Sequence, residues 1–353
     1  MFKKMVKRVL VTGGAGFIGS HLVDYLIERG HDVRVIDDLS GGLKENINQK
    51  AHYLQGSIVD EKLVEEAVKD CEVIYHLAAY AAEGLSHFIR KFNYTNNLIG
   101  SLNLINAAIR NSVKTFLFTS SMAVYGTGVP PFDEDDLPNP EDPYGIAKYT
   151  VEKDLQCAHK LFGINYIIIR PHNVYGERQF LGDPYRNVIG IFMNRIMQNK
   201  PPLIYGDGEQ TRAFSYIHDV ILCIAEAPFM EKAQNQIINI GSAKVHTINE
   251  LAEKVIRAMG TNIKPVYAQA RHEVKHAHCT TKKSEEILNY KDLTQLDGGL
   301  FRMAQWAKKN GPMAPIVWED YEITHRLPEF WKNLSLEFPD APKRINAANL
   351  LGG

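Results

Sequence analysis

Tyr144 and Lys148 stand four positions apart just after Asp142-Pro143, a pair typical of a helix start. Helical residues at this spacing lie on one face, so the ammonium group would adjoin the phenol. A tyrosine with a pKa of ~10 is a weak base at neutral pH, but a neighbouring positive charge favours its phenolate form. The pair therefore predicts a side chain that takes a proton from a substrate hydroxyl. Because the same spacing is common on surface helices, the prediction depends on the surrounding elements.

Ser121 is a second candidate for proton chemistry. It follows the apolar run at 115–119, which predicts a strand, and its hydroxyl could bond the substrate oxygen that Tyr144 deprotonates. The alternative is a serine that bonds only its own backbone. No G-x-S-x-G turn surrounds Ser121, which disfavours covalent serine catalysis.

A glycine-rich turn near the amino terminus predicts a dinucleotide site. Residues 9–20 combine an apolar run, the spacing Gly14-x-Gly16-x-x-Gly19 and the start of an amphipathic segment. A strand, a tight turn and a helix in that order bring backbone N–H groups to a pyrophosphate. The next predicted strand ends at Asp37, whose carboxylate can accept hydrogen bonds from both ribose hydroxyls. We therefore expect NAD rather than NADP, whose 2′-phosphate Asp37 would repel, with Lys148 holding the nicotinamide ribose.

Strand and helix patterns alternate from the amino terminus to about residue 172. This alternation predicts an α/β fold, a Rossmann-type doubly wound parallel sheet with helices on both faces. Ligands of such sheets bind beyond the carboxyl ends of the strands. Five residues fall at these ends and should meet in one crevice: Gly19, Asp37, Ala78, Ser121 and Pro171.

The alternation weakens beyond residue 172. We expect a NAD-binding domain over 1–172, with some later segments returning to it, and a smaller mixed α/β substrate-binding domain over 173–335. Residues 336–353 form a predicted tail. Helices are expected at 219–228 and 247–259, and the second begins with the capping box Thr247-Ile248-Asn249-Glu250.

The composition is that of an ordinary globular protein of 353 residues, 45% hydrophobic and 23% charged, with a net charge of −1. This balance provides no overall field for nucleic acid or membrane surfaces, so neither is an expected partner. No apolar run has the length of a signal or membrane segment, which favours a cytoplasmic location. The four cysteines and the histidines at 272–278 match no zinc spacing, so reduced thiols and no metal are expected.

Six segments carry motifs that work together in a known family: residues 12–19, 76–79, 119–126, 144–148, 170–176 and 206–212. They resemble the extended short-chain dehydrogenase/reductase family, in its branch of NAD-dependent nucleotide-sugar epimerases and dehydratases. Members of the UDP-glucose 4-epimerase type are the most similar. The resemblance extends over most of the chain, to about residue 290.

The resemblance implies roles for individual residues. Ser121, Tyr144 and Lys148 would be catalytic. The substrate would be bound by Ser121 and by four residues that hold its nucleotide diphosphate and ribose: Asn173, Arg212, Arg271 and Glu273. The NAD contacts would come from Gly13, Gly16, Phe17, Ile18, Asp37, Asp38, Ser57, Ile58, Leu77, Ala78, Ala79, Asn97, Tyr144, Lys148 and Pro171.

Two positions depart from the family pattern. Ser57 replaces the aspartate of the usual Gly-Asp-Ile segment at the adenine, so a hydrogen bond remains possible without the charge. Met122 follows Ser121, where similar dehydratases and glucuronate decarboxylases carry an acid, and a thioether cannot transfer protons. The cysteine of 3,5-epimerases is also absent at Met122 and Ala123. These departures favour simple epimerisation.

We therefore expect a NAD-dependent 4-epimerase of a UDP-hexose, UDP-N-acetylhexosamine or UDP-glucuronate that acts through a transient 4-keto sugar. The alternatives are a dehydratase or C4 oxidase of a nucleotide sugar, possibly a GDP-sugar, and a catalytically silent NAD-binding regulatory protein. The helices near 95–109 and 144–162 carry apolar residues on more than one face, which together with the resemblance predicts a homodimer.

Overall fold

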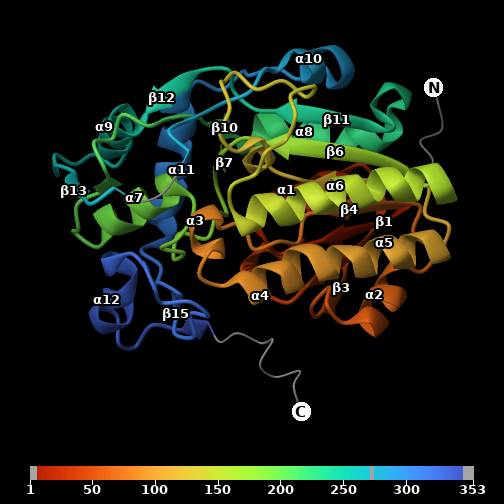
Figure 1. The fold of residues 1–353 in the computed structure, drawn as a ribbon, viewed down its shortest axis with the longest axis horizontal. Coiled ribbons are helices and arrows are strands. Elements are labelled where there is room, and N and C mark those ends of the chain that lie inside the picture. Colours follow the sequence, from red (N-terminus) through yellow and green to blue (C-terminus); the bar gives the residue numbers. More distant parts are fainter. Residues whose placement is uncertain (1–5, 271–273, 345–353) are drawn as a thin grey trace.

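The computed structural model describes residues 6–270 and 274–344. Its centre is a parallel sheet of seven strands in the order β11-β6-β5-β4-β1-β2-β3, as Figure 1 shows. The strand order reverses between β1 and β4, which places a ligand crevice beyond their carboxyl ends. The predicted Rossmann-type sheet is confirmed. In chain order its strands are β1 (Arg8–Thr12), β2 (Asp32–Asp37), β3 (His52–Gln55), β4 (Val73–His76), β5 (Thr115–Thr119), β6 (Asn165–Pro171) and β11 (Gln236–Ile240).

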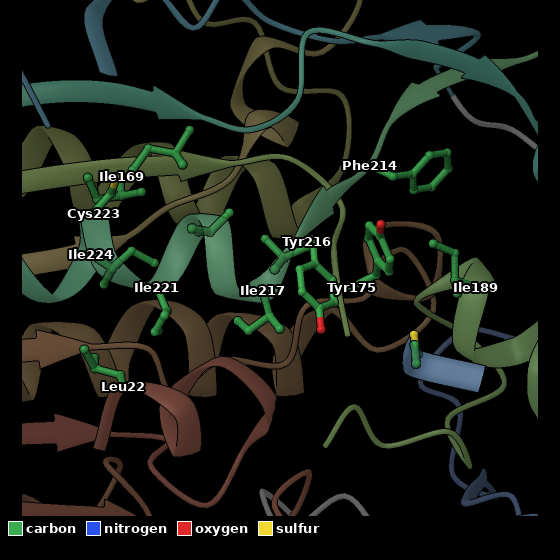
Figure 2. Packing of buried hydrophobic residues seen from close by; sticks show 14 of the residues in the cluster. Leu22, Ile169, Tyr175, Ile189, Phe214, Tyr216, Ile217, Ile221, Cys223 and Ile224 are labelled. Atoms are coloured by element: carbon green, nitrogen blue, oxygen red, sulfur yellow. The ribbon is translucent and has the colours of Figure 1, made fainter. Parts of the chain in front are cut away.

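Helices cover both faces of the sheet because the central strands are apolar on both sides. One face packs against α1 (Phe17–Glu28) and α8 (Ile217–Glu226). Figure 2 shows α8 side chains such as Ile221 and Ile224 in one cluster with Leu22 of α1 and Ile169 of β6. The opposite face packs against α2 (Glu61–Val68), α5 (Gly100–Arg110) and α6 (Pro143–Phe162).

Two helix starts confirm local predictions. Asp142 caps α6 by accepting from the N–H of Gly145, and Pro143 stands in the first turn. Thr247 and Glu250 form the predicted capping box of α9 (Ile248–Ala258). The helix expected at 95–109 begins with a π-helical turn, Thr95–Ile99, before α5.

A second group of elements lies at one end of the sheet, on the left of Figure 1. It contains the small sheets β12-β9-β14, β13-β8 and β10-β7, and helices from the second half of the chain. The helices are α7 (Val188–Met197), α9, α11 (Leu296–Asn310) and α12 (Glu329–Glu337), whereas α10 (Lys282–Leu288) lies above β11 at the top of Figure 1. The strands are β7 (Val174–Tyr175), β8 (Leu203–Tyr205), β9 (Thr211–Ala213), β10 (Ser215–Tyr216), β12 (Val245–Thr247), β13 (Val266–Ala268) and β14 (His276–Ala277).

The chain passes between these two regions more than once. After β10 it returns to the main sheet through α8 and β11, and α12 crosses the predicted boundary between residues 335 and 336. Two short helices, α3 (Glu83–Ser86) and α4 (Arg90–Tyr94), lie between the regions after β4. Within the described ranges, no helix has the length and apolarity needed to cross a membrane.

Candidate active site

The glycine-rich turn between β1 and α1 packs closely against the protein's own backbone only because it lacks side chains. Gly13 has φ +72°, and a Cβ there would lie 2.9 Å from the backbone nitrogen of Ala78. A Cβ on Gly19 would collide with the carbonyl of Gly13, so this glycine lets α1 start close to the turn. The turn therefore fits the pyrophosphate of a dinucleotide, as the glycine spacing predicts.

Asp37 presents its carboxylate at the end of β2. One oxygen accepts from the N–H of Ala15 at 2.9 Å, and the other accepts from the N–H of Leu39 at 2.8 Å. Burial raises the pKa of Asp37, while these backbone donors oppose the rise. Each carboxylate oxygen can accept more than one hydrogen bond, so the group can also receive ribose hydroxyls. These residues fit NAD.

A buried hydrogen-bond chain fixes the strand ends beneath this turn. The Thr12 hydroxyl oxygen accepts from the N–H groups of Leu77 and Ala78 at 3.1 and 3.0 Å. Its own proton therefore goes to Nδ1 of His76, 2.8 Å away, and Nε2 of His76 donates to Ser101. Burial lowers the pKa of His76, which keeps the imidazole neutral. These hydrogen bonds hold the ends of β1 and β4 together where a ligand would lie.

The site brings together Ser121, Tyr144 and Lys148. Ser121 follows the end of β5, and the other two residues lie near the start of α6. Lys148 is buried, its Nζ donates to the carbonyl of Thr119 at 2.8 Å, and it lies 5.7 Å from the centre of the Tyr144 ring. Burial raises the pKa of Tyr144, and the nearby Ser121 hydroxyl acts against this rise. The three predicted catalytic residues are thus adjacent.

The sequence predicts that the Lys148 ammonium favours the phenolate of Tyr144, and the pKa values of the two groups differ from this expectation. Burial raises the pKa of Tyr144, with a further rise from Glu83, and these effects outweigh Ser121. Burial also lowers the pKa of Lys148 to about 7, against the opposing charge of Glu152. The ammonium therefore does not activate the phenol by itself, because the same burial that favours the neutral phenol also favours the neutral amine.

The residues predicted to contact NAD converge on one cavity of about 300 Å³. Asn97 is the exception: its amide instead bonds the N–H and carbonyl of Tyr80, and it does not line the cavity. The predicted residues along the cavity are Gly13, Gly16, Phe17, Ile18, Asp37, Asp38, Ser57, Ile58, Leu77, Ala78, Ala79, Ser121, Tyr144, Lys148, Pro171 and Asn173.

A second cavity of about 220 Å³ adjoins the first and contains Arg212 on β9. The Arg212 guanidinium donates to the carbonyl of Val274 at 2.7 Å. Asn173 lines both cavities, whereas Arg271 and Glu273 lie outside the described residues. The residues common to both linings are here called the shared wall: Ala81, Glu83, Asn173, Val174, Gln179, Arg186 and Asn187.

The shared wall contains two charged residues that sequence reasoning missed. Glu83 comes from α3 and Arg186 from the loop before α7, and both act on the pKa of Tyr144, the carboxylate raising it and the guanidinium lowering it. Arg186 pairs with Asp183 at 2.9 Å and stacks over the ring of Tyr80, 4.9 Å from its centre. Neither residue belongs to a motif, and no periodic pattern could have indicated them.

A buried ion pair connects β6 to α6 next to the site. Two nitrogens of Arg170 on β6 donate to Glu152 on α6 at 2.6 and 3.0 Å, and Ser120 donates to the same carboxylate. The side chains of Arg170 and Glu152 are each 1% exposed. The pair joins the strand that ends at Pro171 to the helix that carries Tyr144 and Lys148.

Comparison with known proteins agrees with this geometry. Residues 9–241 match the family described as the NAD dependent epimerase/dehydratase family. The chain is 39% identical over 309 residues to a putative UDP-glucose 4-epimerase of Methanocaldococcus jannaschii, in a match that covers 86% of this chain and 99% of that protein. It is also 33% identical to a UDP-N-acetyl-alpha-D-glucosaminuronate decarboxylase of Bacillus cytotoxicus, with coverages of 86% and 99%.

Among solved structures, the UDP-glucose 4-epimerase of Thermotoga maritima with UDP-glucose is similar over 86% of this chain and 99% of that one. The TM-score is 0.79 and the sequence identity is 36%. The TM-score indicates a shared fold, and the sequence identity indicates shared ancestry.

Proposed function

Because the chain belongs to the NAD dependent epimerase/dehydratase family and is thus a NAD-dependent enzyme, we propose that it is a 4-epimerase of UDP-sugars. The observation that carries the proposal is the shared wall. It joins the cavity that fits NAD and contains Tyr144 to the cavity that contains Arg212. A nucleotide diphosphate held near Arg212 would extend its sugar across this wall toward Tyr144.

Tyr144 removes the proton from the C4 hydroxyl of the sugar, and Ser121 orients the same oxygen by hydrogen bonding. When bound, NAD supplies a nicotinamide that takes a hydride from C4 and returns it, and whose positive charge favours a nearby phenolate. Lys148 holds the nicotinamide ribose and adds charge when it is protonated. The protein's own contribution is thus position, proton transfer and the exclusion of water.

The two cavities suit a reaction in which the 4-keto sugar turns while its anchor stays in place. Arg212 and Asn173 would hold the diphosphate, because a guanidinium matches phosphate oxygens and an amide adds a donor. The sugar then presents its opposite face, and Tyr144 returns the proton to C4's oxygen as the carbon is reduced. The net reaction inverts one stereocentre and consumes no external oxidant.

Decarboxylation of a UDP-glucuronate is the second candidate, because decarboxylases are among the relatives. Met122 is an argument against it. This residue follows Ser121, is 8% exposed and packs in an apolar cluster with Val124, Tyr125 and Phe132. A thioether there offers no proton donor or acceptor comparable to a carboxylate.

A substrate panel tests the proposal. The purified enzyme is incubated with UDP-glucose, UDP-N-acetylglucosamine, UDP-glucuronate and GDP-mannose, and the products are identified by NMR and mass. We expect a C4 epimer of unchanged mass from at least one UDP-sugar. Loss of water would indicate a dehydratase, loss of carbon dioxide a decarboxylase, and stoichiometric NADH an oxidase. Firm NAD binding without turnover of any sugar would support the silent regulatory protein.

We also propose that the enzyme is a homodimer through α5 and α6, which lie side by side in Figure 1. Four large apolar side chains of α6 and of the π-helical turn before α5 are exposed, namely Ile99 (46%), Ile146 (39%), Leu161 (75%) and Phe162 (59%). Exposed apolar residues along adjacent helices favour burial against a second copy.

A further inference from the structure

The carboxyl-terminal part of the chain packs against the elements that form the shared wall. The two relatives and the solved structure described above are matched over 99% of their length but cover only 86% of this chain, so this chain is longer. Residues 312–344, here called the C-terminal strap, follow α11. They contain β15 (Val317–Trp318), α12 and β16 (Lys343–Arg344). Figure 1 shows α12 and β15 at the end of the molecule that carries α3 and α7.

The strap first binds the loop that supplies Arg186. The N–H of Ile316 donates to the carbonyl of Gly182 at 3.0 Å. The N–H of Trp318 donates to the hydroxyl of Tyr185 at 3.0 Å, and the hydroxyl of Tyr321 lies 2.9 Å from the same oxygen. The residue immediately before Arg186 is therefore held through two strap residues.

The strap also binds the start of α4 and the residue Phe88 before it, which follow α3 and its wall residue Glu83 along the chain. The carboxylate of Glu322 accepts from the N–H groups of Lys91 and Phe92, at 2.6 and 2.8 Å, at the start of α4. The N–H of Glu322 donates to the carbonyl of Phe88 at 2.9 Å. Trp331 packs edge-on against Phe88, with ring centres 6.0 Å apart.

Trp318 connects the strap to Arg186, one of the two charged residues of the shared wall. Its indole Nε1 donates to the hydroxyl of Tyr80 at 3.2 Å, and the Tyr80 ring lies under the Arg186 guanidinium. Trp318 and Tyr80 are 2% and 6% exposed. An arginine loses several side-chain rotations when it is fixed, so a ring held in one orientation favours one position of the guanidinium.

No strap residue lines either of the two cavities, so the strap can act on a ligand only through other residues. We propose that the C-terminal strap positions the shared wall for the sugar of the substrate, and that Trp318 is the positioning residue for Arg186, acting through Tyr80. The inference rests on the proposed function for the identity of that ligand. In this proposal the strap holds the residues of the shared wall in one arrangement.

The test measures binding without turnover. Full-length protein loaded with NAD and carrying Tyr144→Phe is titrated with UDP-glucose by calorimetry. Adding Trp318→Phe, which keeps an aromatic ring but removes the N–H donor, should raise the Kd about five-fold, the effect of one buried hydrogen bond. The NAD content should not change. Trp306→Phe is the matched control, because Trp306 lies on α11 outside the strap, and its Kd should equal that of the parent.

A double-variant cycle separates positioning from general loosening of the fold. If Trp318 acts through Tyr80, adding Trp318→Phe to Tyr80→Phe should raise the Kd no further. Additive increases, or an unchanged Kd in Trp318→Phe, would overturn the inference. Should Trp318→Phe fold poorly, Tyr321→Phe provides a second test. It keeps the ring and removes only the hydroxyl that contacts Tyr185, and it should also raise the Kd. A wild-type protein that binds UDP-glucose but epimerises no sugar would overturn the proposed function and leave this Kd comparison valid.

Discussion

Burial of Lys148 makes the stability of the cofactor-free protein depend on pH. The pKa of this amine is about 7 in the folded chain, below its ordinary value of 10.5, so between these values the unfolded chain binds more protons. The free energy of unfolding should therefore rise with pH across this window.

Lys148→Met should remove this dependence. The stability difference, wild type minus variant, should become more favourable to the wild type by roughly 1 kcal/mol per pH unit between about pH 7 and 9. Chemical denaturation of the two NAD-free proteins at several pH values measures it. Other titrating groups cancel in the difference, so a constant difference across the window would contradict the burial argument.

Residue types and spacing predicted the parts of the site that depend on local backbone geometry. Gly13 and Asp37 stand where a strand meets a turn, and the sequence around each shows that turn directly. Glu83 and Arg186 could not be predicted in the same way. They come from a four-residue helix and a loop, whose positions depend on contacts with residues more than a hundred positions later, such as Trp318.

At the scale of elements, the pair between Arg170 and Glu152 holds β6 against α6. Both charges are buried, so removing one leaves the other unpaired. Glu152→Gln should lower the free energy of unfolding by about 3–5 kcal/mol. The control is Glu65→Gln, because Glu65 pairs with Arg110 at the surface, where both side chains are more than one third exposed. Glu65→Gln should lower the free energy of unfolding by less than about 1 kcal/mol. Equal losses in denaturant titrations would show that the buried pair is not the connection proposed.

The elements themselves were largely predictable, because strand and helix periodicities are local properties of the sequence. The π-helical turn at Thr95–Ile99 was not predictable from periodicity. It coincides with Asn97, whose amide bonds the backbone of Tyr80 rather than facing the cavity. The family motif located this asparagine near the site, and in the structure its amide holds the segment after β4.

At the scale of the whole molecule, the proposed dimer is open to direct measurement. Light scattering should give twice the mass of one chain. Leu161→Glu places a charge on the exposed apolar side of α6 and should shift the mass toward that of a monomer. A monomeric wild type at micromolar concentration would contradict the dimer without affecting the site within one chain.

The return of α8 and β11 to the main sheet shows why domain boundaries were harder to predict than elements. The sequence indicates each element, but which sheet a strand joins depends on partners far along the chain, as with β11 beside β6. The division at residue 172 therefore stays a prediction about the first half of the chain, while the substrate cavity draws residues from both halves.

The central claim is that Tyr144 moves the proton during epimerisation. Tyr144→Phe removes one hydroxyl and keeps the ring that packs beside Lys148. We expect turnover of the UDP-sugar identified in the panel to fall about 10²–10⁴-fold, while NAD content and the melting temperature stay those of the wild type. Turnover by the NAD-loaded variant at the wild-type rate would contradict the account.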